Sequence, residues 1–307
     1  MKILVTGCNG QDGFYASNFL IEKGHKVFGI SKKKSSISNK NFKNKILDLS
    51  NLHAFENYLY EVNPDLILNF SVVHGSAGFN YEEFLIESYN VNVSVVAIIL
   101  KFLRSNKNSK LSFISSSKVF ESKRSNIINE NSKRVNSCIY SFQKNYCNEL
   151  INFYRKNHGV NVSIFYTFNH DSLRRGSEFF IPKIAEILVN SIKDKSYKTS
   201  VKTLNFFSDW GYAKEYAEII SKISLEIKNE DFIIATGNSI YAEDLVNSIF
   251  KSYKLDFKDH IFEEKFEKHK SVKKLIADIS KLKSFGYEIK YNSYDVLKIL
   301  VEQKINK

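Results

Sequence analysis

The chain has 307 residues, of which 43% are hydrophobic, which is enough for one large α/β domain with or without a smaller lobe. No run reaches the roughly 18 uninterrupted apolar residues that a membrane helix needs, and the N-terminus lacks the pattern of a signal peptide. The net charge of +12 comes from lysines scattered along the chain, which favours a solvated basic surface over a nucleic-acid site. The three cysteines have no metal-ligand spacing and favour a reducing compartment. We therefore expect a cytoplasmic protein without a metal, a membrane partner or a nucleic-acid partner.

The hydrophobic pattern predicts strands that alternate with helices along the first half of the chain. Strands are expected over residues 2–6, 26–30, 66–72, 111–115 and 160–167, and helices over 13–23, 52–62, 93–103 and 141–156. Residues 31–45, rich in Lys, Ser and Asn, are expected to form the longest loop of that half. This alternation predicts an α/β fold with a doubly wound parallel sheet. We expect a Rossmann domain over 1–167 that returns at about 204–236, and a smaller substrate lobe built from 168–203 and 237–307.

A glycine-rich segment separates the first predicted strand from the first predicted helix. Residues 6–13 read TGCNGQDG, with glycines at G-x-x-G-x-x-G spacing. A turn without side chains lets the backbone approach a pyrophosphate, and the N-terminus of the next helix supplies N–H donors. The segment therefore predicts a dinucleotide-binding loop. The cofactor contacts expected in it are Gly7, Asn9, Gly10, Gln11, Asp12 and Gly13.

The end of the second predicted strand discriminates between the two nicotinamide dinucleotides. NAD-binding proteins place a carboxylate there to accept from the ribose 2′-hydroxyl. This chain has SKKKSS at 31–36 and no acidic residue. Ammonium and hydroxyl groups suit a 2′-phosphate, so we expect Lys32 and Lys33 to bind NADP, with NAD as the alternative.

Tyr140 and Lys144 form a predicted catalytic pair. They lie four residues apart on an expected helix and therefore share one face. A nearby ammonium favours the phenolate and lowers the tyrosine pKa from about 10 toward neutrality. The phenolate can accept the proton of a sugar hydroxyl while hydride leaves for nicotinamide. The preceding strand ends in serines, and Ser116 is expected to orient that hydroxyl.

Four segments resemble the GDP-mannose 4,6-dehydratase family of extended short-chain dehydrogenases. They are TGCNGQDGF at 6–14, FNHDSLRRG at 168–176, DWGYAKEY at 209–216 and IATG at 234–237. The family patterns are T-G-x-T-G-Q-D-G-S/T, F-N-H-E-S-P-R-R-G, D-W-G-H-A-K-D-Y and I-A-T-G. The resemblance covers nearly the whole chain and implies a nucleotide-sugar substrate. It also implies a homodimer or a dimer of dimers, paired through the helices after Asn92 and Tyr140.

The resemblance assigns further binding roles. It implies cofactor contacts for Asp48, Leu49, Asn69, Ser71, His170 and Arg175, together with Tyr140 and Lys144, the latter holding the nicotinamide ribose. It implies substrate contacts for Ser117, Asn169, Arg174 and Lys183. Arg174 and Arg175 would bind a phosphate of the cofactor or of the nucleotide. For Asn169 and His170 the alternative is a structural role in the turn after a strand.

The chain departs from the family where the catalytic glutamate should lie. Family members carry S-T-S-E or S-T-D-E there, whereas residues 115–118 read SSSK. The family glutamate removes the C5 proton and assists the departure of the C6 hydroxyl, and a protonated lysine cannot accept that proton. Lys118 could act as a base only if burial or like charges lowered its pKa, and the alternative is that it points away.

Two further departures affect the nucleotide. Ser208 stands where the family has the arginine of R-D-W, and Lys268 stands near the position of another nucleotide-binding arginine of the family. The identity of the nucleobase in the substrate therefore stays open. We expect the enzyme to oxidise a hydroxyl of an NDP-hexose or NDP-heptose, and C4 is the favoured position. The alternatives are a full 4,6-dehydratase, an epimerase, and a cofactor-binding protein without activity.

Overall fold

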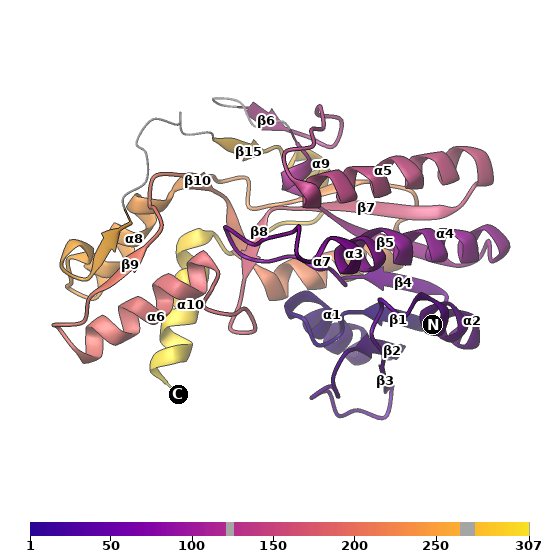
Figure 1. Cartoon of the computed structure of the whole chain (residues 1–307), viewed down its shortest axis with the longest axis horizontal. Coiled ribbons are helices and arrows are strands. Elements are labelled where there is room, and N and C mark those ends of the chain that lie inside the picture. The colour runs from indigo at the N-terminus through magenta and orange to yellow at the C-terminus, as the bar shows by residue number, and fades with distance from the viewer. Residues whose placement is uncertain (121–125, 265–273, 307) are drawn as a thin grey trace. The chain divides into compact units, whose positions relative to one another are not determined.

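The computed structural model describes residues 1–120, 126–264 and 274–306. The chain divides into two compact units. The first unit contains residues 1–120, 133–167 and 216–232, and the second contains 126–132, 168–215, 233–264 and 274–306. Figure 1 follows the chain through both units.

A seven-stranded sheet organises the first unit (Figure 1). The strand order is β12-β7-β5-β4-β1-β2-β3. β1 pairs in parallel with β2 and with β4, and the pairs β2–β3, β4–β5 and β5–β7 are also parallel. The strands are β1 (Lys2–Thr6), β2 (Lys26–Ser31), β3 (Phe42–Ile46), β4 (Leu66–Asn69), β5 (Lys110–Ser116), β7 (Asn161–Thr167) and β12 (Phe232–Ile234). The predicted α/β class and Rossmann topology are confirmed.

The strand order reverses between β1 and β4. From β1 the chain passes through α1 (Gln11–Glu22) to β2 and β3, and then through α2 (Leu52–Val62) to β4 on the other side of β1. Right-handed crossovers in opposite directions place their helices on opposite faces of the sheet. α2 packs against α4 (Val95–Ser105), and α4 packs against α5 (Ile139–His158). Ligands of doubly wound sheets bind where the order reverses, which is at the ends of β1 and β4.

Two predicted boundaries in the first unit are wrong. Residues 42–46 lie largely in the expected loop 31–45 but form β3, whose side chains are mostly exposed. An edge strand is held by backbone pairing, here with β2, so it needs no apolar run that a sequence pattern would reveal. The strand expected to continue to Val72 ends at Asn69, whose side chain accepts a hydrogen bond from Thr6 at 2.7 Å.

The helix expected over 93–103 begins earlier and contains a wide turn. It is preceded by α3 (Leu85–Tyr89) and by the π-helical turn η1 (Asn90–Ser94). The polar residue Asn92 interrupts the apolar pattern, so the sequence did not indicate that the helix begins earlier. Asn92 is nevertheless only 1% exposed, because its side-chain amide is hydrogen-bonded to both the N–H and the carbonyl of Val73. The continuous helix over 85–105 has 21 residues. The wide turn therefore places a polar anchor inside an otherwise apolar helix.

By length and composition alone, this helix could cross a membrane. Its most apolar window has a mean hydropathy of 1.4, and half of that window is buried. The buried core helix of a globular domain gives the same signal. Four of its apolar side chains have no exposed surface, namely Val95, Val96, Ile99 and Leu100.

The second unit is built from helices and short strand pairs. α6 (Phe180–Lys193) and α8 (Ala242–Ser252) both pack on α10 (Ser293–Ile305), around an apolar core that includes the nearly buried Trp210. The pairs β8–β11, β9–β14 and β6–β15 are parallel, and β10–β13 is antiparallel. The strands are β6 (Asn126–Ile128), β8 (Asn169–Asp171), β9 (Thr199–Val201), β10 (Phe207–Ser208), β11 (Trp210–Tyr212), β13 (Ile240–Tyr241), β14 (Ile261–Glu263) and β15 (Leu275–Ala277). The second unit also contains α9 (Ser280–Ser284) and the short turn η3 (Phe257–Asp259). The helix α7 (Ala213–Glu226) lies mostly in the first unit, which also contains the short turn η2 (Ser117–Val119).

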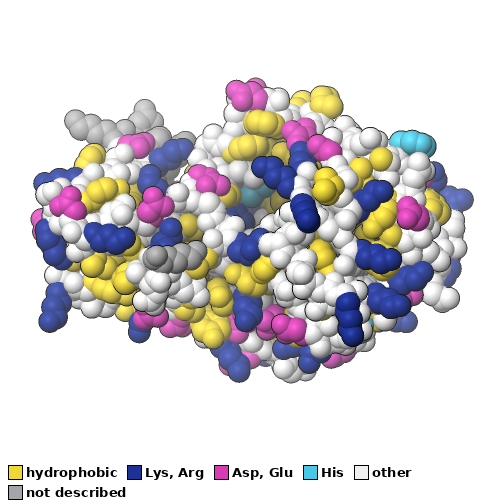
Figure 2. Space-filling model, turned by 90° about the horizontal axis from the view of Figure 1, so that it is seen from below, with side chains coloured by type: hydrophobic (Ala, Val, Ile, Leu, Met, Phe, Trp, Pro, Cys, Tyr) yellow, Lys and Arg dark blue, Asp and Glu magenta, His cyan; other side chains and the backbone are white. Residues whose placement is uncertain are grey.

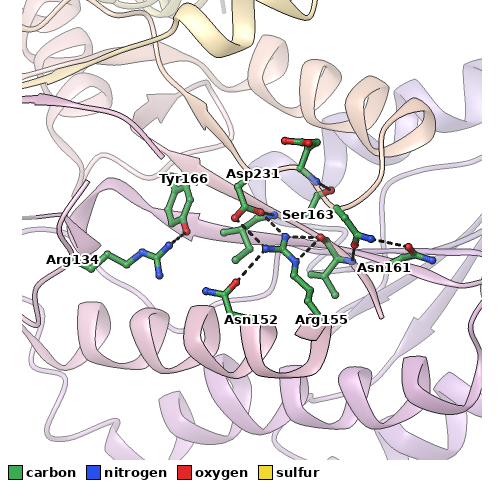
Figure 3. A network of polar contacts seen from close by, with 11 residues as sticks. Arg134, Asn152, Arg155, Asn161, Ser163, Tyr166 and Asp231 are labelled. Atoms are coloured by element: carbon green, nitrogen blue, oxygen red, sulfur yellow. Dashed lines mark hydrogen bonds and ion pairs between the residues drawn. The ribbon is translucent and has the colours of Figure 1, made fainter. Parts of the chain in front are cut away.

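Arg155 anchors the C-terminal half of α5 to the sheet (Figure 3). Its two terminal nitrogens donate to the two carboxylate oxygens of Asp231 at 2.5 and 3.1 Å. Its Nε donates to the carbonyl of Val162 on β7 at 3.0 Å, and Asp231 accepts from the backbone N–H of Ile164 at 2.9 Å. This network fixes the helix that carries the predicted catalytic pair.

The charged side chains on one face of the molecule are dispersed. Figure 2 shows Lys and Arg side chains spread over one face of the molecule, with Asp and Glu side chains between them. On this face the two kinds of charge are interspersed.

Candidate functional site

The glycine loop joins β1 to α1 at the point where the strand order reverses. Gly7 has a φ of +70°, and a Cβ there would lie 3.1 Å from the backbone nitrogen of Ser71. A Cβ on Gly13 would lie 2.3 Å from the carbonyl oxygen of Gly7. Gly10 closes the turn by donating its N–H to the same oxygen at 2.9 Å. Only glycine therefore fits at positions 7 and 13, and the loop lies against the end of β4.

Buried polar groups line this junction. Thr6 donates to the side chain of Asn69 at 2.7 Å and accepts the backbone N–H of Ser71 at 3.2 Å. Asn69 and Ser71 are 2% and 9% exposed. The hydroxyl of Ser71 is buried and has no hydrogen-bond partner among the residues that the structure describes. A backbone cradle with an unsatisfied hydroxyl beside it fits a dinucleotide.

The basic segment after β2 lies beside the glycine loop. The side-chain amide of Asn9 donates to the carbonyls of Lys33 and Lys34 at 2.8 and 3.2 Å. Both lysine side chains are exposed. The structure thus places Asn9 against the backbone of the basic cluster that motivated the prediction of NADP.

Lys32 already has anionic partners. Its ammonium lies 2.8 Å from Glu87 and 3.2 Å from Asp48. The hydrogen bond to Glu87 raises the pKa of Lys32, and the backbone N–H of Ser50 holds the pKa of Asp48 below its usual value. These groups are partly exposed, so the pairs are weak. Lys32 therefore offers less uncompensated charge to a phosphate than the prediction assumed.

The other predicted contacts of the loop lie at the start of α1 and after β3. Gln11 is 6% exposed, and its amide nitrogen lies 3.4 Å from a carboxylate oxygen of Asp12. Leu49 is 6% exposed and follows Asp48. Leu49 is therefore largely buried, whereas Asp48 is partly exposed.

The catalytic pair lies in the first turns of α5. Tyr140 and Lys144 are 7% and 3% exposed. The ammonium of Lys144 donates to the carbonyl of Ile114 at 2.6 Å and lies 5.7 Å from the centre of the Tyr140 ring. It also lies 4.7 Å from the ring of Phe113 on β5. Burial lowers the pKa of Lys144 to about 8, so at pH 7 most of it still carries a charge beside the tyrosine.

Ser116 is the last residue of β5, and Lys118 lies in the short turn η2 that follows the strand. The hydroxyl of Ser116 accepts the backbone N–H of Lys118 at 3.2 Å, which leaves its own proton for another acceptor. Ser117 begins the short turn η2, which packs against α5. The side chain of Lys118 is exposed.

Two aromatic residues that the sequence analysis missed lie on the Tyr140 ring. The imidazole of His74 stacks on it with ring centres 4.4 Å apart and an interplanar angle of 25°. Nδ1 of His74 is hydrogen-bonded to the hydroxyl of Tyr81. Both residues lie between β4 and α3, a segment without a motif, so no spacing rule could have found them.

The remaining predicted residues lie in the second unit. Asn169 donates to the hydroxyl of Ser208 at 2.7 Å, and His170 Nδ1 lies 2.7 Å from the carbonyl of Phe168. These contacts join β8 to β10 and brace the turn at the start of β8. Lys183 lies on α6, and Lys268 lies outside the described residues.

The two predicted arginines follow β8. The backbone N–H of Arg174 donates to the hydroxyl of Ser172 at 3.2 Å. The guanidinium of Arg175 lies 3.7 Å from the ring centre of Phe179 and 3.7 Å from the carboxylate of Asp171. Stacking and ion pairing thus orient the side chain of Arg175.

Asp209 connects two of the four motif segments. Its carboxylate accepts from the hydroxyl of Thr236 at 2.8 Å and from the backbone N–H of Gly237 at 2.9 Å. Burial raises the pKa of Asp209 to about 6. The segment at 209–216 therefore holds the turn at 234–237 in place.

Within residues 1–120, 126–264 and 274–306, no three His, Cys, Asp or Glu side chains are grouped to hold a metal ion.

Comparison with solved structures agrees with this fold. The UDP-glucose 4-epimerase of Thermotoga maritima, solved with UDP-glucose, superposes with a TM-score of 0.84 at 18% identity and covers 100% of both chains. The dTDP-glucose 4,6-dehydratase of Bacillus anthracis, solved with NAD, gives a TM-score of 0.83 at 18% identity. It covers 100% of this chain and 97% of its own. At such identities the likeness supports the fold alone.

Sequence comparison reaches the family. The GDP-mannose 4,6-dehydratase of Vibrio cholerae serotype O1 is 28% identical over 250 residues, which are 76% of this chain and 67% of the relative. The family model described as GDP-mannose 4,6 dehydratase matches residues 4–300. The chain therefore belongs to the GDP-mannose 4,6-dehydratase family of extended short-chain dehydrogenases.

Proposed function

We propose that this protein is a cytoplasmic enzyme that oxidises a hydroxyl of an NDP-hexose or NDP-heptose, at C4, with NADP preferred over NAD. The observation that carries the proposal is the buried ammonium of Lys144, held 5.7 Å from the ring of Tyr140. A carbonyl of the central sheet fixes that ammonium at 2.6 Å. Family membership supports a nucleotide-sugar substrate.

The proton step belongs to Tyr140. Its phenolate accepts the hydroxyl proton of the sugar, and the charge of Lys144 favours that phenolate. Ser116 hydrogen-bonds the same hydroxyl and orients it. When bound, a nicotinamide dinucleotide would take up the hydride from the carbon, so that one proton and one hydride leave the sugar and a ketone remains.

The cradle for the dinucleotide consists of Gly7, Gly10 and Gly13 with the unsatisfied hydroxyl of Ser71. Lys33 is exposed beside this cradle and supplies positive charge for a 2′-phosphate. Because Lys32 is paired with Glu87 and Asp48, Lys33 and Lys34 contribute most to the preference for NADP. His170 and Arg175 complete the proposed cofactor contacts.

The product is proposed to be a 4-keto sugar that keeps its C6 hydroxyl. Loss of water needs a base for the C5 proton and an acid for the leaving hydroxyl. The family uses a glutamate for these steps, whereas this chain has the exposed Lys118 in its place and no carboxylate at that position. Epimerisation through the same ketone is the nearest alternative, and dehydration would need another group.

A second copy of the chain is the proposed partner. Phe142, Tyr146 and Phe153 of α5 are 56%, 47% and 56% exposed. Their spacing places these three side chains along one face of α5. The helix α5 packs against η1, which continues α3, and Ile86 and Tyr89 of α3 are also exposed. An apolar stripe on a helix pair suits a two-fold interface, in which the same surface is used twice. A monomer in light scattering at micromolar concentration would contradict this.

The proposed activity is tested by product mass. In three separate reactions, the protein and NADP are incubated with a GDP-hexose, a CDP-hexose or a UDP-hexose. The mass of each product is measured by mass spectrometry. Loss of two hydrogens is the expected result, whereas loss of water indicates a dehydratase and an unchanged mass with a new isomer indicates an epimerase. Tyr140→Phe is the control and should give no product. If no nucleotide sugar is changed while the dinucleotide binds, the protein is a cofactor-binding protein without this activity.

A further inference from the structure

The segment between β4 and α3 is built against the catalytic tyrosine. The imidazole of His74 is stacked on the Tyr140 ring at 4.4 Å and 25°. The ring of Tyr81 is nearly parallel to that of Tyr140 at 6.2 Å and 17°. The hydrogen bond between His74 Nδ1 and the Tyr81 hydroxyl links these two side chains to each other. The geometry of Tyr140 therefore depends on residues from a different part of the chain.

The backbone beside His74 is anchored to the same helix that carries Tyr140. Asn92 accepts the N–H of Val73 at 2.8 Å and donates to its carbonyl at 3.1 Å. The same amide donates to Gln143 of α5 at 2.8 Å. Gln143 in turn donates to the hydroxyl of Ser88 on α3 at 2.9 Å. Asn92 and Gln143 are both nearly buried, so these bonds are shielded from water.

We propose that His74 is a positioning residue for Tyr140, with Tyr81 as the residue that orients the imidazole. The hydrogen bond to Tyr81 sets the rotation of the imidazole, and the stack sets the plane of the Tyr140 ring. The plane of the ring fixes the directions of the in-plane lone pairs on the phenol oxygen, and hence their alignment with the proton of the sugar hydroxyl. Lys144 contributes the charge and His74 the orientation. The role in hydride transfer rests on the proposed function, whereas the effect on the Tyr140 ring does not.

The phenol of Tyr81 suits this role because it stays protonated. Burial raises the pKa of Tyr81 to about 12, so the group keeps its proton at neutral pH. A phenol that keeps its proton can donate it to Nδ1 of the imidazole. The Tyr81–His74 bond is then compatible with the phenolate form of Tyr140, because neither residue contributes a negative charge.

The test compares three single variants and one double variant with the wild-type protein. His74→Ala removes the stack, His74→Phe keeps a ring without the nitrogen, and Tyr81→Phe keeps its ring without the hydroxyl. We expect His74→Ala to lower kcat for sugar oxidation about tenfold, with KM and the cofactor Kd within threefold. His74→Phe should stay within threefold of wild type, because the ring is what orients Tyr140. Tyr81→Phe should lower kcat about threefold, but should have no further effect when added to His74→Phe.

A second readout needs no substrate. The protein is labelled with ¹³C at the ε carbons of tyrosine, and the Tyr140 signals are identified by their loss in Tyr140→Phe. A ring held by stacking flips slowly and gives two ε signals in the wild type and in His74→Phe. In His74→Ala the ring is released, and we expect the two signals to merge.

Each result has a consequence. If His74→Ala keeps kcat within threefold, or leaves the two Tyr140 signals separate, His74 does not position the ring. If His74→Phe is as impaired as His74→Ala, the nitrogen rather than the stack is needed, and the proposal is also overturned. If no variant and no wild-type sample oxidises any nucleotide sugar, the proposed function fails, and the tyrosine signals alone decide the positioning.

Discussion

Removal of the Asp231 carboxylate should destabilise the first unit substantially. The pair Arg155–Asp231 is bidentate, with N–O distances of 2.5 and 3.1 Å, and the two side chains are only 18% and 21% exposed. Breaking a buried ion pair from one side costs about 3–5 kcal/mol, because the other charge is left without a partner. Partial exposure reduces this cost, and we expect Asp231→Ala to lower the free energy of unfolding by about 2–3 kcal/mol. The backbone N–H of Ile164 also loses its acceptor in this variant.

The assay is urea unfolding followed by far-ultraviolet circular dichroism. Lys101→Ala is the matched control, because it breaks the pair with Glu56 in which the lysine is 67% exposed, and it should change stability much less than Asp231→Ala does. The cycle of Arg155→Leu, Asp231→Leu and the double variant isolates the pair, with an expected coupling above about 1.5 kcal/mol. If Asp231→Ala is no less stable than Lys101→Ala, the network does not anchor α5, and the fold of the catalytic helix must depend on packing alone.

Four further outcomes are expected. Lys144→Met should abolish oxidation yet raise stability at pH 7. The pKa of Lys144 is about 8 in the folded protein and near its usual 10.5 in the unfolded chain, so the buried charge destabilises the fold fully below pH 8. This destabilisation disappears as the pH rises toward 10.5, and unfolding of the wild type and of Lys144→Met across this pH range measures it. Lys118→Glu should create or raise water loss from the 4-keto product, and rapid release of a 4-keto-6-deoxy sugar by the wild type would refute the role given to this position. Titration should show NADP bound more tightly than NAD, with Lys33→Ala weakening NADP alone, whereas tenfold tighter binding of NAD would contradict it. Tyr140→Phe should leave the cofactor Kd nearly unchanged while oxidation is lost, and activity within tenfold of wild type would show that another group is the base.

Features that depend on neighbouring residues could be predicted from the sequence. The glycine spacing of residues 6–13 predicts a turn between a strand and a helix, and the structure has that turn with Gly7 at positive φ. The four-residue interval between Tyr140 and Lys144 predicts one helix face, and both side chains lie against the same buried region. Periodicity also located the buried strands, because a strand inside a parallel sheet is apolar on both faces.

Features that depend on contacts between distant segments could not be predicted. The stack of His74 on Tyr140 joins residues that no motif connects, and the Arg155–Asp231 pair joins residues 76 positions apart. The strand β3 was not predicted, because an edge strand carries exposed side chains and is defined by its pairing with β2. The pairing of Lys32 with Glu87 shows the same limit, since a basic cluster in sequence does not reveal which of its charges are already matched.

Hydride transfer from C4 is most directly tested by stopped-flow absorbance of reduced nicotinamide in a single turnover. The substrate is the nucleotide sugar that gives a product in the mass screen, prepared with hydrogen or with deuterium at C4. The catalytic role of Tyr140 and Lys144 predicts that reduced nicotinamide appears with the wild-type protein, forms more slowly from the deuterated sugar, and does not form with Tyr140→Phe. Equal rates for the two sugars together with an active Tyr140→Phe would contradict oxidation at C4 by this tyrosine.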